Sequence, residues 1–90
     1  MATFRTNIGE QSTEILPAAP WNTRRRSGFT IVNDSAVKIY LSFSGPAVVG
    51  KGTPLYPNGG SISLSGSAVP ETAISGIAAA AGAAAAGEEW

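Results

Sequence analysis

The sequence predicts an all-β protein: a small antiparallel β-sandwich or barrel of roughly six to eight short strands, preceded by an extended N-terminal arm. Two observations lead to this prediction. Apolar and polar residues alternate in several short segments, which is the period of a strand with one buried face. Clusters of Asn, Asp, Gly and Pro separate these segments, and such clusters form turns.

The clearest alternation begins after Ser27. Phe29, Ile31 and Asn33 share one face of a first strand, and the apolar residues of segment 37–43 share one face of a second. Between the two strands, Asn33-Asp34-Ser35 tolerates left-handed backbone and bonds to its own backbone, so we expect a hairpin there.

Two further strands follow. Residues 53–56 form a short strand anchored by Leu55, and the prolines at 54 and 57 confine it to a sheet edge or a bend. After the turn at residues 58–60, Ser61–Ser65 alternates serine with Ile62 and Leu64 and is the most regular strand pattern in the chain.

The tail from Glu71 to Trp90 is open to two interpretations. Its alanines favour a helix by intrinsic propensity, but glycines interrupt the run repeatedly. The alternative, which we prefer, is a hairpin of strands 73–79 and 84–90 turning around Gly82. Small side chains suit a strand in a closely packed sheet.

The charge pattern divides the chain into an extended arm, residues 1–26, and a β-sandwich domain, residues 27–90. The arm holds four arginines and two glutamates, a net +2, and the domain balances it with −2. Pro17 and Pro20 favour extended backbone in the arm, with one short strand near Glu14–Leu16. An arm with Phe4 and Trp21 but no core of its own should lie on another surface, either that of its own domain or that of a neighbour.

Composition argues against catalysis and metal binding. The chain has no His, no Cys and 13% charged residues, whereas acid–base, nucleophilic and transition-metal chemistry draw on those residue types. Glu88 and Glu89 are adjacent, so on a strand they face opposite sides. Gly50-Lys51-Gly52-Thr53 lacks the full phosphate-loop motif. We therefore expect no enzyme activity, catalytic residue, cofactor or metal.

Size and charge bear on the partners. A chain of 90 residues without Cys builds a marginal core, so oligomerisation is a plausible reinforcement. The net charge of zero favours neither nucleic acid nor an anionic membrane. The longest apolar stretch, residues 77–86, is too short to cross a bilayer, and the N-terminus lacks a signal-peptide pattern.

The order of signals resembles a known class. A basic cluster precedes segment 29–35, a strand pattern over 37–43 follows, then Gly50-Lys51-Gly52, Asn58-Gly59-Gly60, a serine-alternating strand and a terminal Glu-Trp. Over about residues 24–90 this is similar to small β-sandwich virion proteins of tailed bacteriophages, the capsid decoration or cement type. The resemblance implies a homotrimer bound to the major capsid protein on the capsid surface of the virion, made in the host cytoplasm.

On this hypothesis, apolar arm residues would be buried against neighbouring shell subunits, and charge contrast would guide the contact. The candidate partner-binding residues are Phe4, Ile15, Leu16, Trp21, Arg24, Arg25, Arg26 and Trp90. For the three arginines, a solvated linker is the competing interpretation, and nucleic acid is a weaker one. For Trp21 and Trp90, the competing interpretation is that each covers the edge of its own domain's core. The alternative function is a fibre or baseplate accessory module that binds carbohydrate through Trp21, Tyr40, Tyr56 or Trp90.

Overall fold

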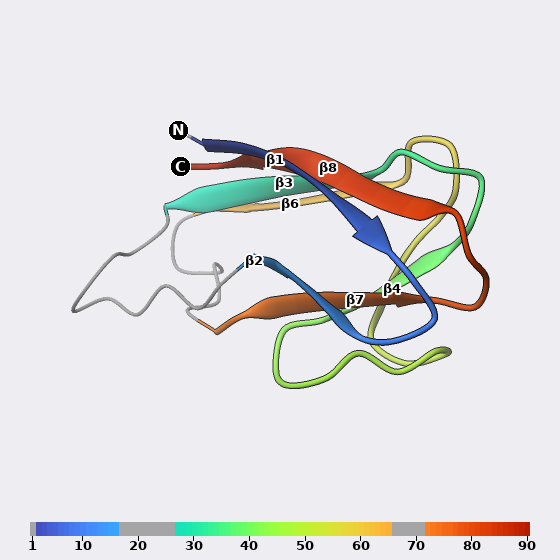
Figure 1. Cartoon of the computed structure of the whole chain (residues 1–90). Helices are drawn as coiled ribbons and strands as arrows, with labels where there is room; N and C mark the ends of the chain where they lie inside the picture. Colours follow the sequence, from blue (N-terminus) through green and yellow to red (C-terminus); the bar gives the residue numbers. More distant parts are fainter. Residues whose placement is uncertain (1, 17–26, 66–71) are drawn as a thin grey trace.

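Two four-stranded antiparallel sheets pack face to face in the computed structural model, which describes residues 2–16, 27–65 and 72–90 (Figure 1). This confirms the predicted all-β sandwich. The eight strands in these ranges are β1 (Ala2–Ile8), β2 (Thr13–Leu16), β3 (Gly28–Asn33), β4 (Ile39–Ser42), β5 (Thr53–Leu55), β6 (Ser61–Ser65), β7 (Ile74–Ala78) and β8 (Ala83–Glu89). No helix in the described ranges has the length and apolar character needed to span a membrane.

The chain passes from one sheet to the other at most of its connections. The first sheet has the order β1-β8-β3-β6 and the second β2-β7-β4-β5. Within the described ranges, β4 and β5 are the only strands adjacent in sequence that also pair. The two predicted hairpins are therefore wrong in their pairing: the turns at residues 33–35 and around Gly82 each carry the chain across the sandwich.

The physical cause of the first crossing is the side chain of Asn33, which is fully buried. Its amide nitrogen donates hydrogen bonds to the carbonyl oxygens of Val37 (2.8 Å) and Leu55 (3.0 Å). Its amide oxygen accepts one from Ser35 Oγ at 2.7 Å. The turn is thus tied to the second sheet instead of folding back along β3.

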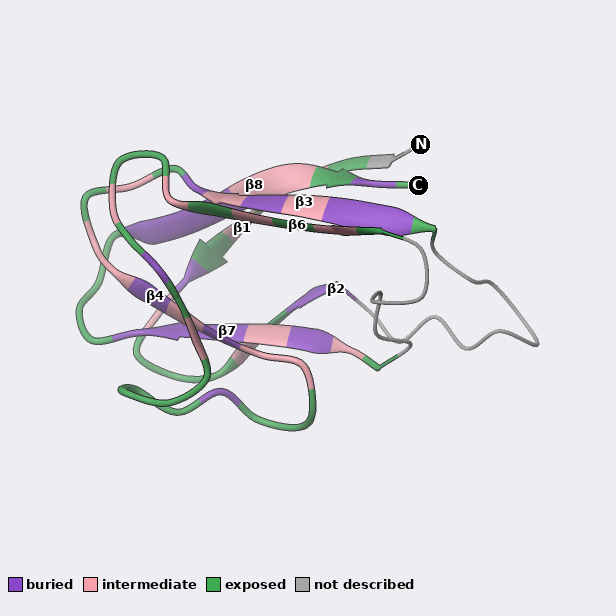
Figure 2. Cartoon of the chain, turned by 180° about the vertical axis from the view of Figure 1, so that it is seen from behind, coloured by how far each residue is buried: buried purple, intermediate pink, exposed green. Residues whose placement is uncertain are grey.

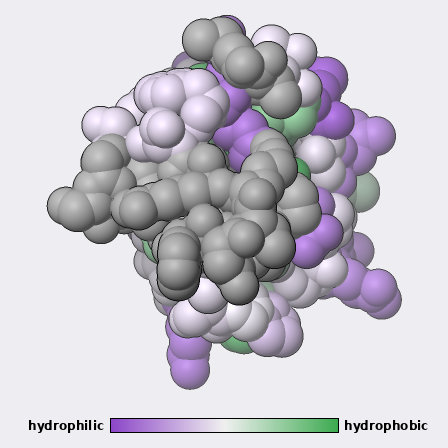
Figure 3. Space-filling view, turned by 90° about the vertical axis from the view of Figure 1, so that its left-hand side faces the viewer, coloured by the Kyte–Doolittle hydropathy of each residue, from purple (hydrophilic) through white to green (hydrophobic). Residues whose placement is uncertain are grey.

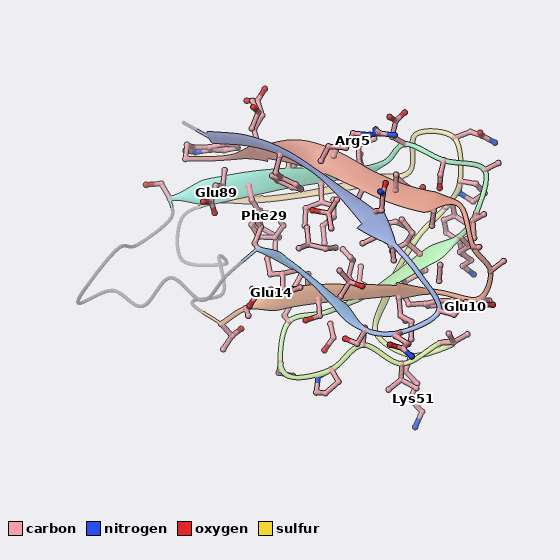
Figure 4. The ribbon with its side chains drawn as sticks, in the orientation of Figure 1. Arg5, Glu10, Glu14, Phe29, Lys51 and Glu89 are labelled. Atoms are coloured by element: carbon pink, nitrogen blue, oxygen red, sulfur yellow. The ribbon has the colours of Figure 1, made fainter. Side chains whose placement is uncertain are left out.

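The core lies between the inward faces of the two sheets, and strands of both layers carry buried residues (Figure 2). Phe29 points into this space (Figure 4), and Ile31, Ile39 and Leu41 are also buried, as the alternation predicts. The remaining buried members of the core are Ile8, Ile15, Leu16, Leu55, Ile74, Ala78, Ala83 and Ala85.

The N-terminal residues belong to the sandwich, which corrects the predicted division at residue 26. Strand β1 pairs with β8 along its whole length, and β2 pairs with β7. A β-bulge between Glu14 and Leu16 interrupts the second pairing. Residues 17–26, the rest of the predicted arm, lie outside the described residues.

The alanine-rich tail forms strands, as we predicted from the sequence in preference to a helix. Strand β8 lies between β1 and β3, and its Gly87 is opposite Phe4 on one side and Ile31 on the other. A Cβ on Gly87 would lie 1.8 Å from the carbonyl oxygen of Thr30. Small residues are needed in this central strand because its neighbours approach closely and already fill the inner face.

Candidate partner-binding surface

The structure places the predicted binding residues in very different environments. Ile15 and Leu16 are buried in the core, and Phe4 is half-buried and packs against it. These three side chains serve the fold of their own domain, so presenting them to a neighbour, as predicted for all three, would expose the core. Trp90 is 43% exposed. Trp21 and Arg24–Arg26 lie outside the described residues.

Trp90 is held at the end of the sandwich where both termini lie (Figure 1). Its backbone N–H donates to the carbonyl oxygen of Gly28 at 3.0 Å, and its carbonyl oxygen accepts from the Gly28 N–H at 3.1 Å. A Cβ on Gly28 would lie 2.6 Å from Cζ2 of the indole, so the ring rests directly on this glycine. The absence of a side chain at Gly28 therefore allows the indole to pack against the backbone at this position.

The same end is shown face-on in Figure 3, where the described surface is mainly hydrophilic or weakly polar and little strongly hydrophobic surface is visible.

The two glutamates before Trp90 differ sharply in their exposure to solvent. Glu88 is exposed, while Glu89 is buried opposite Phe29 (Figure 4). This confirms that the two adjacent glutamates face opposite sides of the strand.

A cluster of aromatic and cationic side chains lies on the outer face of the hairpin formed by β4 and β5. We call Lys38, Tyr40, Pro54 and Tyr56 the tyrosine cluster. Lys38 Nζ lies 5.1 Å from the ring centroid of Tyr40 and 4.7 Å from that of Tyr56, within the range of a cation–π contact. Pro54 is opposite Tyr40 in the strand register.

Strand geometry explains why the side chains of the tyrosine cluster lie on the same outer face. Ile39 and Leu55 are paired and both point into the core, so Lys38, Tyr40 and Tyr56 must point outward. Tyr56 is 60% exposed, the most exposed of the large hydrophobic side chains in the described ranges. Tyrosine combines a large apolar ring with a polar hydroxyl and is enriched where proteins bind one another.

The tyrosine cluster also carries positive charge. In the described part of the chain the one ion pair joins Arg5 and Asp34, both exposed. Lys38 has no carboxylate partner there and contacts two rings instead. An aromatic surface with an unneutralised ammonium is complementary to a partner that presents carboxylates beside apolar groups.

The loop between β4 and β5 adds exposed apolar side chains, Val48 at 51% and Val49 at 44%. The Ala47 N–H donates to Ser12 Oγ at 2.8 Å, which fastens this loop to the turn between β1 and β2. Sequence reasoning missed Lys38, Pro54, Val48 and Val49. The run Ala47-Val48-Val49 between Pro46 and Gly50 was an available signal, because three apolar residues in a predicted loop are unusual.

A hollow of about 530 Å³ beside the Arg5–Asp34 pair is a second candidate site. It opens to solvent between the end of β1, the turn at Asp34 and the turn before β8. Its two charged groups neutralise each other, and the rest of its lining is largely small residues, including Gly9 and Ala81. No group of three or more His, Cys, Asp or Glu side chains suited to a metal occurs in the described ranges. We therefore take the tyrosine cluster, and not this hollow, as the stronger candidate for the partner-binding surface.

Comparison of the chain with protein-family models, with curated proteins and with solved structures found no match.

Proposed function

We propose that the protein is a structural component of a tailed-phage virion, a capsid decoration or cement protein that binds the major capsid protein and stabilises the shell. The observation that carries the proposal is the tyrosine cluster, an exposed aromatic surface on a small domain. The cluster replaces Ile15 and Leu16 as the contact surface, because those side chains form the core. The sequence resemblance supplies the class of partner.

The tyrosine cluster suits a protein partner better than a sugar. A sugar stacks on a free aromatic face, but the ammonium of Lys38 lies over the faces of both Tyr40 and Tyr56. A partner carboxylate could reach the same ammonium while apolar groups pack beside Tyr56. Carbohydrate binding by a fibre or baseplate accessory module stays the second candidate, because it would use the same two tyrosines.

The first test is co-sedimentation of the purified protein with shells assembled from the major capsid protein of the same genome. We expect Tyr56→Ala to weaken binding about tenfold or more, as truncation of a central aromatic contact does. Tyr56→Phe should retain most of the affinity, because the ring is kept. Both variants should melt at the wild-type temperature, since Tyr56 is exposed. Trp90→Ala tests the rival surface, and loss of binding in that variant alone would overturn the assignment to the tyrosine cluster.

Substituting Lys38 distinguishes the two proposed functions, because it should change binding affinity in opposite directions for a protein and for a sugar. If the partner is an acidic protein surface, Lys38→Gln weakens binding, and added salt weakens the wild type. If the ligand is a sugar, Lys38→Gln frees the ring faces and strengthens binding. Binding to a glycan array that increases in the variant would replace the capsid proposal with the carbohydrate one.

A further inference from the structure

Of the four sheet edges in the described structure, β6 has the fewest features that prevent strands of two molecules from pairing. Edge strands are usually protected by charge, proline, bulges or short length. Strand β1 carries Arg5, β2 carries Glu14 and a bulge, and β5 has three residues including Pro54. Strand β6, Ser-Ile-Ser-Leu-Ser, has five residues and none of the other features.

The outward backbone groups of β6 belong to its serines. The Asn33 N–H donates to the Gly60 carbonyl oxygen at 2.8 Å. Hydrogen-bonded pairs alternate along an antiparallel ladder, so Ile62 and Leu64 bond towards β3. Ser61, Ser63 and Ser65 therefore direct their N–H and C=O groups away from β3, along the open side of the strand.

The sequence of β6 is nearly the same read in either direction. A two-fold axis through Ser63 would place Ser63 opposite Ser63 of a second copy, and Ser61 opposite Ser65. The outward groups of these serines would then meet in about six backbone hydrogen bonds, two for each hydrogen-bonded pair. No charged residue would face another, because β6 has none.

The apolar residues fit the same register. Ile62 and Leu64 point to the core side but are half-buried, at the rim of the core. In the paired arrangement Ile62 would be opposite Leu64 of the second copy in a non-hydrogen-bonded pair, where side chains approach most closely. Pairing would thus cover apolar surface that one copy leaves partly exposed.

We propose that two copies of this chain associate through β6, antiparallel about a two-fold axis at Ser63, so that the two four-stranded sheets join into one continuous sheet. The outer face would carry a row of hydroxyls, because Thr30 Oγ1 and Ser63 Oγ are already 2.8 Å apart in one copy. Such an isologous contact closes with two copies. It gives a dimer in place of the trimer that the sequence resemblance implies.

The test is the mass in solution, measured by light scattering during size exclusion over a range of concentrations. We expect the wild type to reach twice the 9.1 kDa of one chain and Ser63→Lys to stay at one. The introduced lysines would face each other across the axis, where like charges repel. Thr3→Lys is the matched control, because Thr3 is exposed on the outer face of the same sheet at its opposite edge. It should remain dimeric.

A second variant keeps the test valid if Ser63→Lys does not fold. The chain has no cysteine, so Ser63→Cys places a single thiol at the axis. Mild oxidation should give a covalent dimer for Ser63→Cys and much less for Thr3→Cys. A wild type that stays monomeric at all concentrations, or an oligomer that Ser63→Lys leaves intact, would overturn the proposal.

Shell binding is measured separately, so the dimer and the capsid proposal can fail independently. If the wild type is a monomer and Ser63→Lys abolishes shell binding, the edge of β6 receives a strand of the partner, and self-pairing is wrong.

Discussion

Asn33 shows how one side chain can determine a chain crossing. Besides the hydrogen bonds of its amide to Val37, Leu55 and Ser35, its backbone carbonyl oxygen accepts from the Gly59 N–H at 2.9 Å. The residue therefore joins the end of β3 to the segment before β4, to β5 and to the turn before β6. A buried polar group is tolerated here because its side-chain donors and acceptor are satisfied.

Replacing Asn33 should destabilise the fold strongly. Asn33→Ala removes the donors to two carbonyl oxygens, and we expect a loss of about 2–4 kcal/mol in the free energy of unfolding, measured by urea denaturation. Asn33→Asp should lose more at neutral pH, because a buried carboxylate would face those carbonyls without a donor. The difference between the two variants should narrow as the pH falls and that carboxylate becomes protonated. Asn7→Ala, at an exposed position, is the control, and an equal loss there would contradict this role.

At the scale of the element, β2 shows how a bulge changes which residues a strand buries. In a regular strand neighbouring residues face opposite sides, so Ile15 and Leu16 could not both point inward. The bulge between Glu14 and Leu16 allows both to enter the core. Gly76 on β7 makes room, because a Cβ there would lie 2.8 Å from Cδ1 of Ile15.

We expect Ile15→Ala and Leu16→Ala each to lower the free energy of unfolding by about 2–5 kcal/mol, the usual result of truncating a large core residue. Glu14→Ala, in the same strand but exposed, should change it by less than about 0.5 kcal/mol. Chemical denaturation followed by tryptophan fluorescence measures all three. Variants as stable as the wild type that lose only partner binding would restore the sequence-based view of β2 as part of a binding arm.

Alternation located several of the strands, but β1 was missed because residues 1–26 were predicted as an extended arm. Strand pairing was not predictable from the sequence. Alternation reports that a segment has one buried face, so β6 was predicted with its observed bounds and β3 within one residue. Alternation does not show to which sheet the strand belongs or with which strands it pairs. The turn at residues 33–35 was typical of a hairpin, and the sequence does not reveal long-range hydrogen bonds such as that of Asn33 to Leu55, which ties the turn to the second sheet.

The candidate site was likewise only partly predictable: some of its residues could be named from the sequence, but their arrangement could not. Tyr40 and Tyr56 were named from the sequence as possible stacking residues. Their gathering with Lys38 depends on the pairing of β4 with β5, a long-range property. Ile15 and Leu16 were assigned to binding because a four-residue strand with a bulge does not show the regular alternation of a core strand.

For the whole molecule, the first sixteen residues complete both layers. Strand β1 forms an edge of one sheet and β2 an edge of the other. Together they contribute Ile8, Ile15 and Leu16 to the core. They also cover β8 and β7, which would otherwise become edges themselves. The N-terminal segment therefore closes one side of the sandwich and cannot be treated as an appendage.

Deleting residues 1–16 should consequently abolish cooperative folding. The shortened chain would lose three large core side chains and expose two strands whose alanine-rich or apolar sequences carry few protecting charges, so we expect aggregation or an unfolded chain. Circular dichroism melting and the dispersion of amide resonances would measure this. Adding a peptide of residues 1–16 in excess should partly restore a cooperative transition, because both missing strands would regain their pairing partners. A shortened chain that melts cooperatively at the wild-type temperature would show that the rest of the chain folds without residues 1–16, in agreement with the domain boundary predicted at residue 26.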